Sequence, residues 1–214
     1  MGEGFEKKRV LAIHDLSGAG KCSLTVVLPV LSALGCAVSV LPTALLSTHT
    51  GGFRDPVCRD LTGDMLPWAE HWRREGACFD AVYSGFLGSA AQIEIVREIF
   101  GMFREVNPAV RIVVDPVMVA TSGARLISDE AKDALVAHLF PLAAVVTPNQ
   151  PEAAALCGFP VEGEGDVERA AQAIAALGGG KAAVLVKGGH GARADDLLRF
   201  PDGTTTWLRG ERIE

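Results

Sequence analysis

The sequence predicts an α/β domain with a mostly parallel central sheet and helices on both of its faces. Short apolar segments alternate with longer segments whose apolar residues recur at helical spacing, in the order βαβαβα. The strand segments are almost continuously apolar, as expected of parallel strands that are covered on both sides. The chain has no internal repeat and no obvious linker, and 49% of its residues are apolar. One domain is therefore expected over residues 1–214.

The expected elements follow from the local patterns, taken in chain order. Strands are expected at residues 10–13, 37–41, 81–83, 111–114, 143–146, 182–186, 196–200 and 205–208. Helices are expected at residues 26–34, 61–75, 90–106, 128–139, 151–156 and 166–177. The helix at 90–106 has a clear apolar face, which includes Ile93, Val96 and Phe103. Residues 42–53, PTALLSTHTGGF, are expected to form a loop, because hydroxyl side chains and a Gly-Gly pair interrupt the pattern.

Several helices carry recognisable signals at their ends. Ser128 is suited to cap the helix that follows it, and Asp64 is a candidate cap near the start of the helix at 61–75. Pro151 fits the first turn of its helix, where the missing N–H would have no helical partner. Three consecutive glycines, 178–180, follow the helix at 166–177 and are typical of a helix C-terminus.

Residues 9–25, RVLAIHDLSGAGKCSLT, form the expected ligand-binding corner of the domain. An apolar strand runs into His14 and Asp15, and a glycine-containing turn then leads into a helix. In open α/β sheets, ligands bind beyond the carboxyl ends of strands and next to helix N-termini. Two phosphate-binding motifs do not fit, because Cys22 replaces the hydroxyl of a P-loop and Ser23 replaces the third glycine of a dinucleotide fingerprint. A loop that only turns the chain is the alternative.

Composition argues against several classes of protein. The formal net charge is −6 and no basic run occurs, so nucleic-acid binding has little support. No apolar stretch has the length of a membrane span, and the first ten residues lack the apolar core of a signal peptide. The five cysteines are scattered without a C-x-x-C pair, so neither disulfides nor zinc are expected. A cytoplasmic protein with no membrane partner is therefore expected.

Polar residues collect at the ends of the predicted strands. In chain order they are His14-Asp15, Ser84, Asp115, Thr147 with Asn149 and Glu152, and Lys187-Gly188-Gly189. Parallel strands end on one edge of a sheet, so these groups are expected to lie near one another. Carboxylates combined with waters suit Mg²⁺, lysine suits a phosphate, and glycines let backbone N–H groups approach a polyphosphate. The sequence therefore predicts a magnesium and phosphate site on this edge.

Each of these residues also has a purely structural explanation. Asp115 could simply end a strand, Asn149 could be only a helix cap, and Lys187 could be a surface lysine. His49 could be an ordinary hydrogen-bonded loop histidine. Cys22 fits a small buried residue better than a nucleophile, because no histidine stands at a telling spacing. Their joint occurrence at successive strand ends favours the functional interpretation.

Longer motifs resemble those of one enzyme superfamily. HDLSGAGKCSLTVVLPVLSALG, PTALLSTHTGGF and YSGFLGSAAQI are similar to segments of bacterial pyridoxal/pyridoxamine kinases of the ribokinase-like superfamily. DPVMVATSG, VVTPNQPEAAALCG and VLVKGGH are more similar to the sister hydroxymethylpyrimidine and phosphomethylpyrimidine kinases. The resemblance covers essentially the whole chain and implies a ribokinase-like three-layer sandwich. It also implies a homodimer that transfers a phosphoryl group from MgATP to the hydroxymethyl group of a small aromatic heterocycle.

The resemblance implies a role for each matching residue. Those expected to face the heterocycle are Asp15, Ser17, Thr48, His49, Thr50 and Phe86. Those expected at ATP are Asp115, Asn149, Glu152, Lys187 and Gly189, with Asp115 and Glu152 holding Mg²⁺ partly through water. Catalysis of this kind depends on positioning and on charge neutralisation.

The HTGGF segment favours a B6 vitamer over a pyrimidine as the substrate, since the pyrimidine enzymes usually carry a glutamine-asparagine pair there. Phosphorylation of a B6 vitamer (pyridoxal, pyridoxamine or pyridoxine) is therefore the first hypothesis. Hydroxymethylpyrimidine kinase activity, which belongs to thiamin synthesis, is the alternative. A dinucleotide-binding Rossmann protein is disfavoured by the failed fingerprint.

One motif of the family has no counterpart in the sequence. Members carry G-T-G-D or G-T-G-C in a segment after the last strands, where it forms an anion hole and supplies the catalytic base. No G-T-G occurs here, and the position expected for that segment lies beyond Glu214. The catalytic base is therefore left unassigned, and two hypotheses remain open, a truncated enzyme and a defective homologue that binds a vitamer without turning it over.

Overall fold

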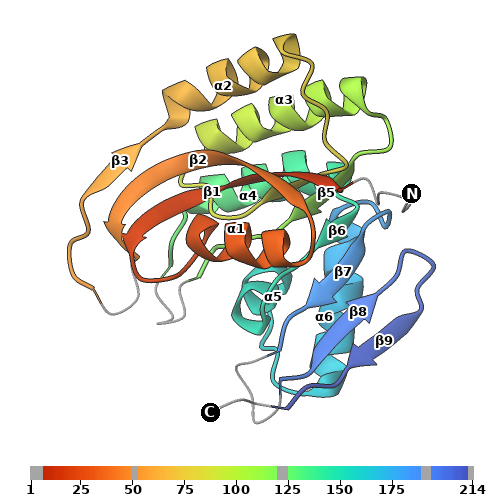
Figure 1. Ribbon diagram of the computed structural model, residues 1–214. Helices are drawn as coiled ribbons and strands as arrows, with labels where there is room; N and C mark the ends of the chain where they lie inside the picture. Colours follow the sequence, from red (N-terminus) through yellow and green to blue (C-terminus); the bar gives the residue numbers. More distant parts are fainter. Residues whose placement is uncertain (1–6, 50–52, 120–124, 189–193, 212–214) are drawn as a thin grey trace.

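The computed structural model describes residues 7–49, 53–119, 125–188 and 194–211, which form a nine-stranded sheet with helices on both faces (Figure 1). The sheet order is β3-β2-β1-β4-β5-β6-β7-β8-β9. Its strands are β1 (Arg9–Ala19), β2 (Ala37–Thr48), β3 (Cys58–Asp60), β4 (Ala81–Ser84), β5 (Arg111–Val114), β6 (Val145–Val146), β7 (Ala183–Val186), β8 (Asp196–Arg199) and β9 (Thr205–Leu208). The strands from β2 to β7 in this order are parallel, whereas β3, β8 and β9 are each antiparallel to their neighbours. The predicted mostly parallel α/β sheet is confirmed.

The helices cover the sheet as right-handed crossovers require. They are α1 (Leu24–Ala33), α2 (Thr62–Arg74), α3 (Ala90–Val106), α4 (Asp129–Ala134), α5 (Gln150–Cys157) and α6 (Glu164–Leu177). The chain moves from β1 to β2 in one direction along the sheet and from β4 to β7 in the other, so α1 falls on one face and α3 and α4 on the opposite face (Figure 1). None of the helices in the described ranges is both long and apolar enough to cross a membrane.

The core lies between the sheet and the layer that contains α3. The predicted apolar face of α3 is fully buried, and its Phe103 packs edge-on against Phe79 with ring centroids 4.8 Å apart. Burial of such aromatic and branched side chains supplies most of the favourable free energy of folding. The bounds predicted for α3 and for β5 are those observed.

β1 and β2 are longer than predicted. β1 pairs with β4 only from Val10 to Ile13, but its pairing with β2 continues, with a register shift after His14, as far as Ala19 and Thr48. Residues 17–19 of the turn predicted at 17–20 are therefore strand, and so are residues 42–48 of the predicted loop at 42–53. The two strands satisfy each other's backbone groups beyond the end of β4, a tertiary pairing that local patterns do not reveal. The short β3 pairs with β2 in the same region and was not predicted.

Ser128 and Pro151 lie at helix starts as predicted, whereas Asp64 and the helix predicted at 128–139 differ from prediction. Ser128 caps α4 as predicted, since its hydroxyl accepts a hydrogen bond from the N–H of Ala131 at 3.1 Å. Asp64 is not a cap but lies in the first turn of α2, where its charge still suits the helix dipole. The predicted helix at 128–139 is only partly an α-helix, because α4 continues as a π-helical turn, η1 (Leu135–Leu139), and a 3-10 turn, η2 (Phe140–Leu142).

Candidate active site

Asp15 lies on the part of β1 that extends beyond the end of β4. Its carboxylate is buried and accepts hydrogen bonds from the hydroxyls of Ser23, at 2.5 Å, and Ser17, at 3.4 Å. Ser23 occupies the position before α1 with φ of +49°, a backbone conformation that residues other than glycine rarely adopt. Its side chain makes no bond to the helix and binds Asp15 instead. The turn before α1 is therefore shaped to hold a hydroxyl against the carboxylate.

The segment after β2 lies against the same turn. The N–H of His49 donates to the carbonyl of Ala19 at 3.2 Å, and its ring lies edge-on to Phe53 with centroids 5.1 Å apart. A Cβ at Gly20, whose φ is +83°, would collide with the His49 ring, so this close approach requires glycine. Thr48 ends β2 directly before His49. Four residues predicted to face the heterocycle are thus brought to one corner, namely Asp15, Ser17, Thr48 and His49. Thr50 lies outside the described residues.

Phe86 stands in the loop that follows β4. Its ring is partly buried against the core, and its carbonyl accepts a hydrogen bond from the hydroxyl of Thr43 at 3.2 Å. Thr43 belongs to β2, so this bond joins the Phe86 loop to the strand that leads to His49.

The opposite side of the edge contains charged residues. Asp115 follows β5, and its carboxylate accepts hydrogen bonds from the ammonium of Lys187 at 2.8 Å and from the hydroxyl of Tyr83 at 3.4 Å. The Asp115 side chain is 13% exposed and that of Lys187 is 36% exposed, so the carboxylate is shielded from solvent whereas the ammonium is partly accessible. Lys187 follows β7 and donates its backbone N–H to the carbonyl of Pro148 at 2.8 Å. The prediction that these strand ends lie together is confirmed.

Asn149 and Glu152 form a capping box at the start of α5. The Asn149 side chain accepts from the N–H of Glu152, and the Glu152 carboxylate accepts from the N–H of Asn149, both at 2.8 Å. Glu152 also accepts from the N–H of Met118 at 3.3 Å and is 2% exposed. Burial raises the pKa of Glu152 to about 7 against the effect of the Asn149 hydrogen bond, and the charge of Asp115 contributes to the rise. The capping explanation for Asn149 is thus correct, and Glu152 combines a cap with a carboxyl group that titrates near neutrality.

Sequence reasoning missed Tyr83, whose ring packs between His14 and the charged residues. The two rings meet edge-on with centroids 4.4 Å apart. Burial lowers the pKa of His14 to about 4, so its imidazole is neutral at pH 7, and its Nε2 has no hydrogen-bond partner among the described residues. Burial and the neighbouring Asp115 raise the pKa of Tyr83, which therefore stays a hydrogen-bond donor. Tyr83 is the chain's single tyrosine and stands directly before Ser84, a signal that could have identified it.

Asp115 and Glu152 are the residues that could hold a metal ion. Within the described ranges no three His, Cys, Asp or Glu side chains converge as a metal cage. Mg²⁺ differs from other ions in that it is commonly held by only one or two carboxylates, with waters and substrate phosphates completing its octahedron. Asp115 and Glu152 are close enough for their charges to interact and therefore fit such a site. Gly189 lies outside the described residues, whereas the N–H of Gly188 is bound to Asp196 at 2.7 Å.

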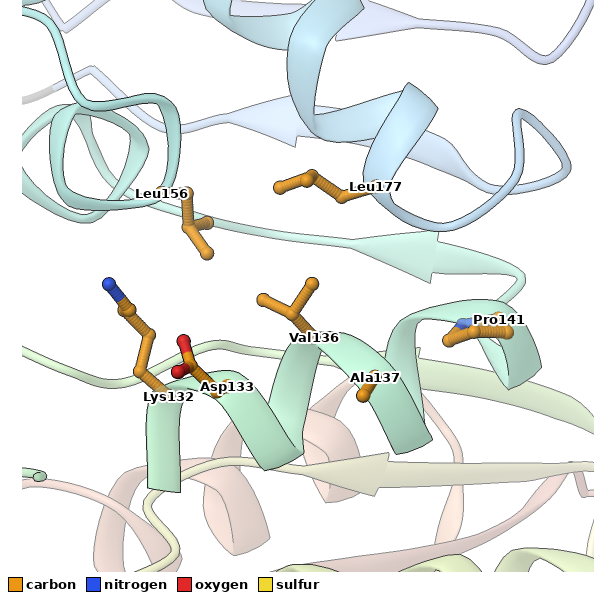
Figure 2. A pocket seen from close by; sticks show the side chains of 7 residues that line it. All are labelled: Lys132, Asp133, Val136, Ala137, Pro141, Leu156 and Leu177. Atoms are coloured by element: carbon orange, nitrogen blue, oxygen red, sulfur yellow. The ribbon is translucent and has the colours of Figure 1, made fainter. Parts of the chain in front are cut away.

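A surface groove elsewhere takes no part in this arrangement. It has a volume of about 300 Å³ and lies between the helix that runs from α4 into η2, the side chain of Leu156 on α5, and that of Leu177 at the end of α6 (Figure 2). Val136, Ala137 and Pro141 line its floor, and Lys132 and Asp133 stand at one end (Figure 2). None of the predicted site residues lines it, so the edge of the sheet remains the candidate site.

The fold, with carboxylates and a lysine at the carboxyl edge of its sheet, is that of a ribokinase-like α/β protein. The chain belongs to the phosphomethylpyrimidine kinase family, which its sequence matches over residues 28–214. It is 36% identical over 212 residues to the hydroxymethylpyrimidine/phosphomethylpyrimidine kinase of Rhizobium meliloti, covering 95% of this chain and 74% of that protein.

Two solved structures illustrate the range of similar proteins. A Bacteroides thetaiotaomicron protein assigned as a phosphomethylpyrimidine kinase, in a crystal form with pyridoxal, is 30% identical with a TM-score of 0.83, over 96% of this chain and 74% of that chain. The pyridoxal kinase of Staphylococcus aureus in complex with ADP is 26% identical with a TM-score of 0.80, over 98% of this chain and 74% of that chain. The superfamily expected from the motifs is confirmed. The first hypothesis of a B6 substrate is not specifically supported, and the pyrimidine alternative fits these relatives better.

Proposed function

We propose that this protein transfers a phosphoryl group from MgATP to hydroxymethylpyrimidine or its monophosphate. The observation that carries the proposal is the group formed by the largely buried carboxylates of Asp115 and Glu152 and the partly exposed ammonium of Lys187 at the carboxyl edge of the sheet, in a chain of the phosphomethylpyrimidine kinase family. Phosphoryl transfer needs little covalent chemistry from the protein and depends on positioning and charge neutralisation. A rim with a carboxylate and hydroxyls on one side and an ion pair on the other suits both requirements.

In this proposal the corner around Asp15 holds the heterocycle. Asp15, Ser17, Thr48 and His49 offer hydrogen-bonding groups there, and the partly buried ring of Phe86 offers an aromatic surface. Heterocycle nitrogens and an amino group pair well with hydroxyls and a carboxylate, whereas stacking suits a flat ring. Thr50 is assigned here on the resemblance alone.

The charged side holds the polyphosphate. The ammonium of Lys187 can exchange Asp115 for a phosphate oxygen, since lysine is a mobile point charge on a long flexible stem. Asp115 and Glu152 would then hold Mg²⁺, which neutralises charge that develops on the transferred group. The Asn149 cap fixes Glu152 in place, because both partners of the capping box are satisfied. Gly189 is assigned to the phosphates on the resemblance alone.

A B6 vitamer remains the second candidate acceptor. Two observations favour it, the HTGGF segment that begins at His49 and the pyridoxal present in the Bacteroides crystal form. Both candidate acceptors are planar heterocycles with a hydroxymethyl group, so the same corner would receive either of them.

The test offers hydroxymethylpyrimidine, pyridoxal and pyridoxamine separately with MgATP and measures the phosphorylated product. Calorimetric binding of each acceptor is measured in parallel, because affinity and rate depend on different residues. We expect turnover and tighter binding with the pyrimidine. Turnover with the B6 vitamers alone would reverse the assignment, and binding of an acceptor without turnover would indicate the vitamer-binding homologue.

We also propose that the protein forms a homodimer through α1. Val26, Val30 and Leu34 follow one another at four-residue spacing along this helix and are 38%, 50% and 73% exposed. Residues 22–53 contain no Asp, Glu, Lys or Arg. In a two-fold contact each patch meets its own copy, so an uncharged apolar patch associates without like-charge repulsion. Light scattering should give a dimer that Val30→Glu converts to a monomer, and a monomeric parent protein would refute this.

A further inference from the structure

Gln92, in the first turn of α3, uses both ends of its side-chain amide for hydrogen bonds in the interior. It is 1% exposed, and its amide oxygen accepts from the N–H of Gly88 at 2.8 Å. Its amide nitrogen lies 3.0 Å from the carbonyl of Thr43, 3.0 Å from the hydroxyl of Thr62 and 3.2 Å from the carboxylate of Asp60. The two N–H groups of the Gln92 amide therefore share three acceptors. A helix needs no such network, since the hydroxyl of Ser89 already caps α3.

The partners of Gln92 come from the two segments that carry the heterocycle corner. Gly88 closes the loop that bears Phe86, two residues away. Thr43 and Asp60 stand at the base of the β2–β3 hairpin, where Ala44 pairs with Asp60. That hairpin leads to Thr48 and His49 at the far end of β2 (Figure 1). Gln92 is thus bonded to the loop of Phe86 and to the base of the hairpin at the same time.

β2 stays paired with β1 as far as Thr48, so a small change at the base of the hairpin moves the β1–β2 pair and the far end of the hairpin together. Thr43 and Thr48 are five residues apart on β2, roughly 17 Å along an extended strand. A tilt of a few degrees at the base therefore moves the tip by about 1 Å, which is enough to cost a reaction up to about 100-fold in rate. The bond between the Thr43 hydroxyl and the Phe86 carbonyl joins the same two segments, but Gln92 supplies most of the contacts.

We propose that Gln92 is a positioning residue that sets the separation between Phe86 and the His49 end of the hairpin, and so the fit of the heterocycle. The proposal rests on the proposed function, since it concerns the acceptor side of that site. Gln92 touches no expected substrate atom and acts through the two segments that it joins. The ATP side depends on β5, β7 and α5, and none of the Gln92 side-chain hydrogen bonds in the described part of the chain reaches these elements, so an effect on the acceptor alone is expected.

The experiment compares Gln92→Met with Asn107→Ala. Methionine keeps the length of the side chain and removes every hydrogen bond of the amide. Asn107 is a matched control, because it ends the same helix and its amide donates to the carbonyl of Phe79 at 2.8 Å, away from the heterocycle corner. We expect Gln92→Met to raise the KM for the accepted heterocycle about tenfold and to change the KM for ATP less than about twofold. The Asn107 variant should leave both KM values within about twofold.

A second variant and a second measurement keep the test decisive. Thr43→Val removes only the bond to Phe86 and should raise the acceptor KM about threefold, whether or not the Gln92 variant folds. Hydrogen exchange should become faster at Gly88 and at residues 58–62 together in Gln92→Met, and at neither place in Asn107→Ala. Equal rises in both KM values, or faster exchange at only one of the two segments, would overturn the proposal. If the parent protein phosphorylates neither a pyrimidine nor a B6 acceptor, the proposed function fails and the exchange pattern alone decides whether Gln92 joins the two segments.

Discussion

The two sides of the candidate site hold their carboxylates by different means. On the β1–β2 side, Asp15 is held by the hydroxyls of Ser17 and Ser23 and has no ion-pair partner among the described residues. On the β5–β7 side, Asp115 is held by the ammonium of Lys187 and lies within reach of the charge of Glu152. The hydroxyl hydrogen bonds constrain the position of a carboxylate. In an ion pair, by contrast, the ammonium can instead bind a phosphate and the carboxylate can instead bind a metal ion. The difference indicates a site that recognises shape on one side and charge on the other.

Removal of the charge at Asp115 should have the largest effect. Asp115→Asn keeps the shape of the side chain but leaves Lys187 without its partner and weakens the hold on Mg²⁺. We expect kcat to fall about 100- to 1,000-fold, while the KM for the heterocycle changes by less than about threefold. Asp80→Asn removes an exposed carboxylate that pairs with Lys8 and should leave kcat unchanged. An unchanged kcat in the Asp115 variant would contradict the assignment of the catalytic charge to the β5–β7 side.

The two sides should also respond to pH in opposite senses. Burial raises the pKa of Glu152 from 4.5 to about 7 and lowers that of His14 from 6.5 to about 4. Between about pH 4.5 and 7 the folded state keeps a proton on Glu152 that the unfolded state has lost. The contribution of Glu152 to the free energy of unfolding therefore falls as pH rises. Between pH 6.5 and 4 the unfolded state binds a proton on His14 that the folded state does not, so that contribution is lost as pH falls. Each amounts to roughly 3 kcal/mol across its window.

The two contributions oppose each other between about pH 4.5 and 6.5, and single variants should separate them. The free energy of unfolding of Glu152→Gln should rise with pH across this window, because only the His14 effect remains. That of His14→Gln should fall across the same window. Urea unfolding at pH 5, 5.5, 6 and 6.5 measures both slopes, and slopes of the same sign would show that one of the two pKa shifts has the wrong direction.

A substitution at Gly85 tests how tightly His14 and Tyr83 are packed between the two sides of the site. A Cβ at this position would collide with Nδ1 of His14, whose ring is buried against Tyr83 and has no room to move. Gly85→Ala should lower the free energy of unfolding by about 1–3 kcal/mol. Gly101→Ala is the control, since a Cβ there meets nothing within 4 Å on α3 and should raise stability by about 0.5–1 kcal/mol. Equal effects in urea unfolding would show that the junction tolerates expansion.

A change at Asp15 should have the smallest effect and should be confined to the acceptor. Asp15→Asn keeps one hydrogen-bond acceptor and removes the charge, so each serine loses only part of its interaction. We expect the KM for the heterocycle to rise about tenfold, in line with a charge-assisted hydrogen bond. Steady-state kinetics should show the KM for ATP unchanged, and a fall in kcat as large as that of the Asp115 variant would remove the contrast.

Local patterns predicted much of the architecture. The apolar face of α3 gave its bounds, and the cap at Ser128 was visible as a serine before a helical segment. The gathering of Asp115 and Lys187 followed from the rule that parallel strands share an edge. Gln92 also had a local signal, since Ser89 and Gln92 stand at capping-box spacing, but its side chain bonds outside the box. The extension of β1 and β2 had no such signal, because each depends on the other for its hydrogen bonds.

The α/β class, the order of the elements and the residues available for chemistry at each strand end all follow from the sequence alone. Hydrophobic periodicity and turn residues involve only neighbouring positions, so they can be recognised in the amino-acid sequence. Which of these groups contact one another depends on how the elements pack in three dimensions. It paired Asp115 with Lys187, 72 residues away along the chain, and packed Tyr83 against His14. It also gave Glu152 and His14 opposite pKa shifts, because burial and neighbouring charges are properties of the folded interior and not of the residue type.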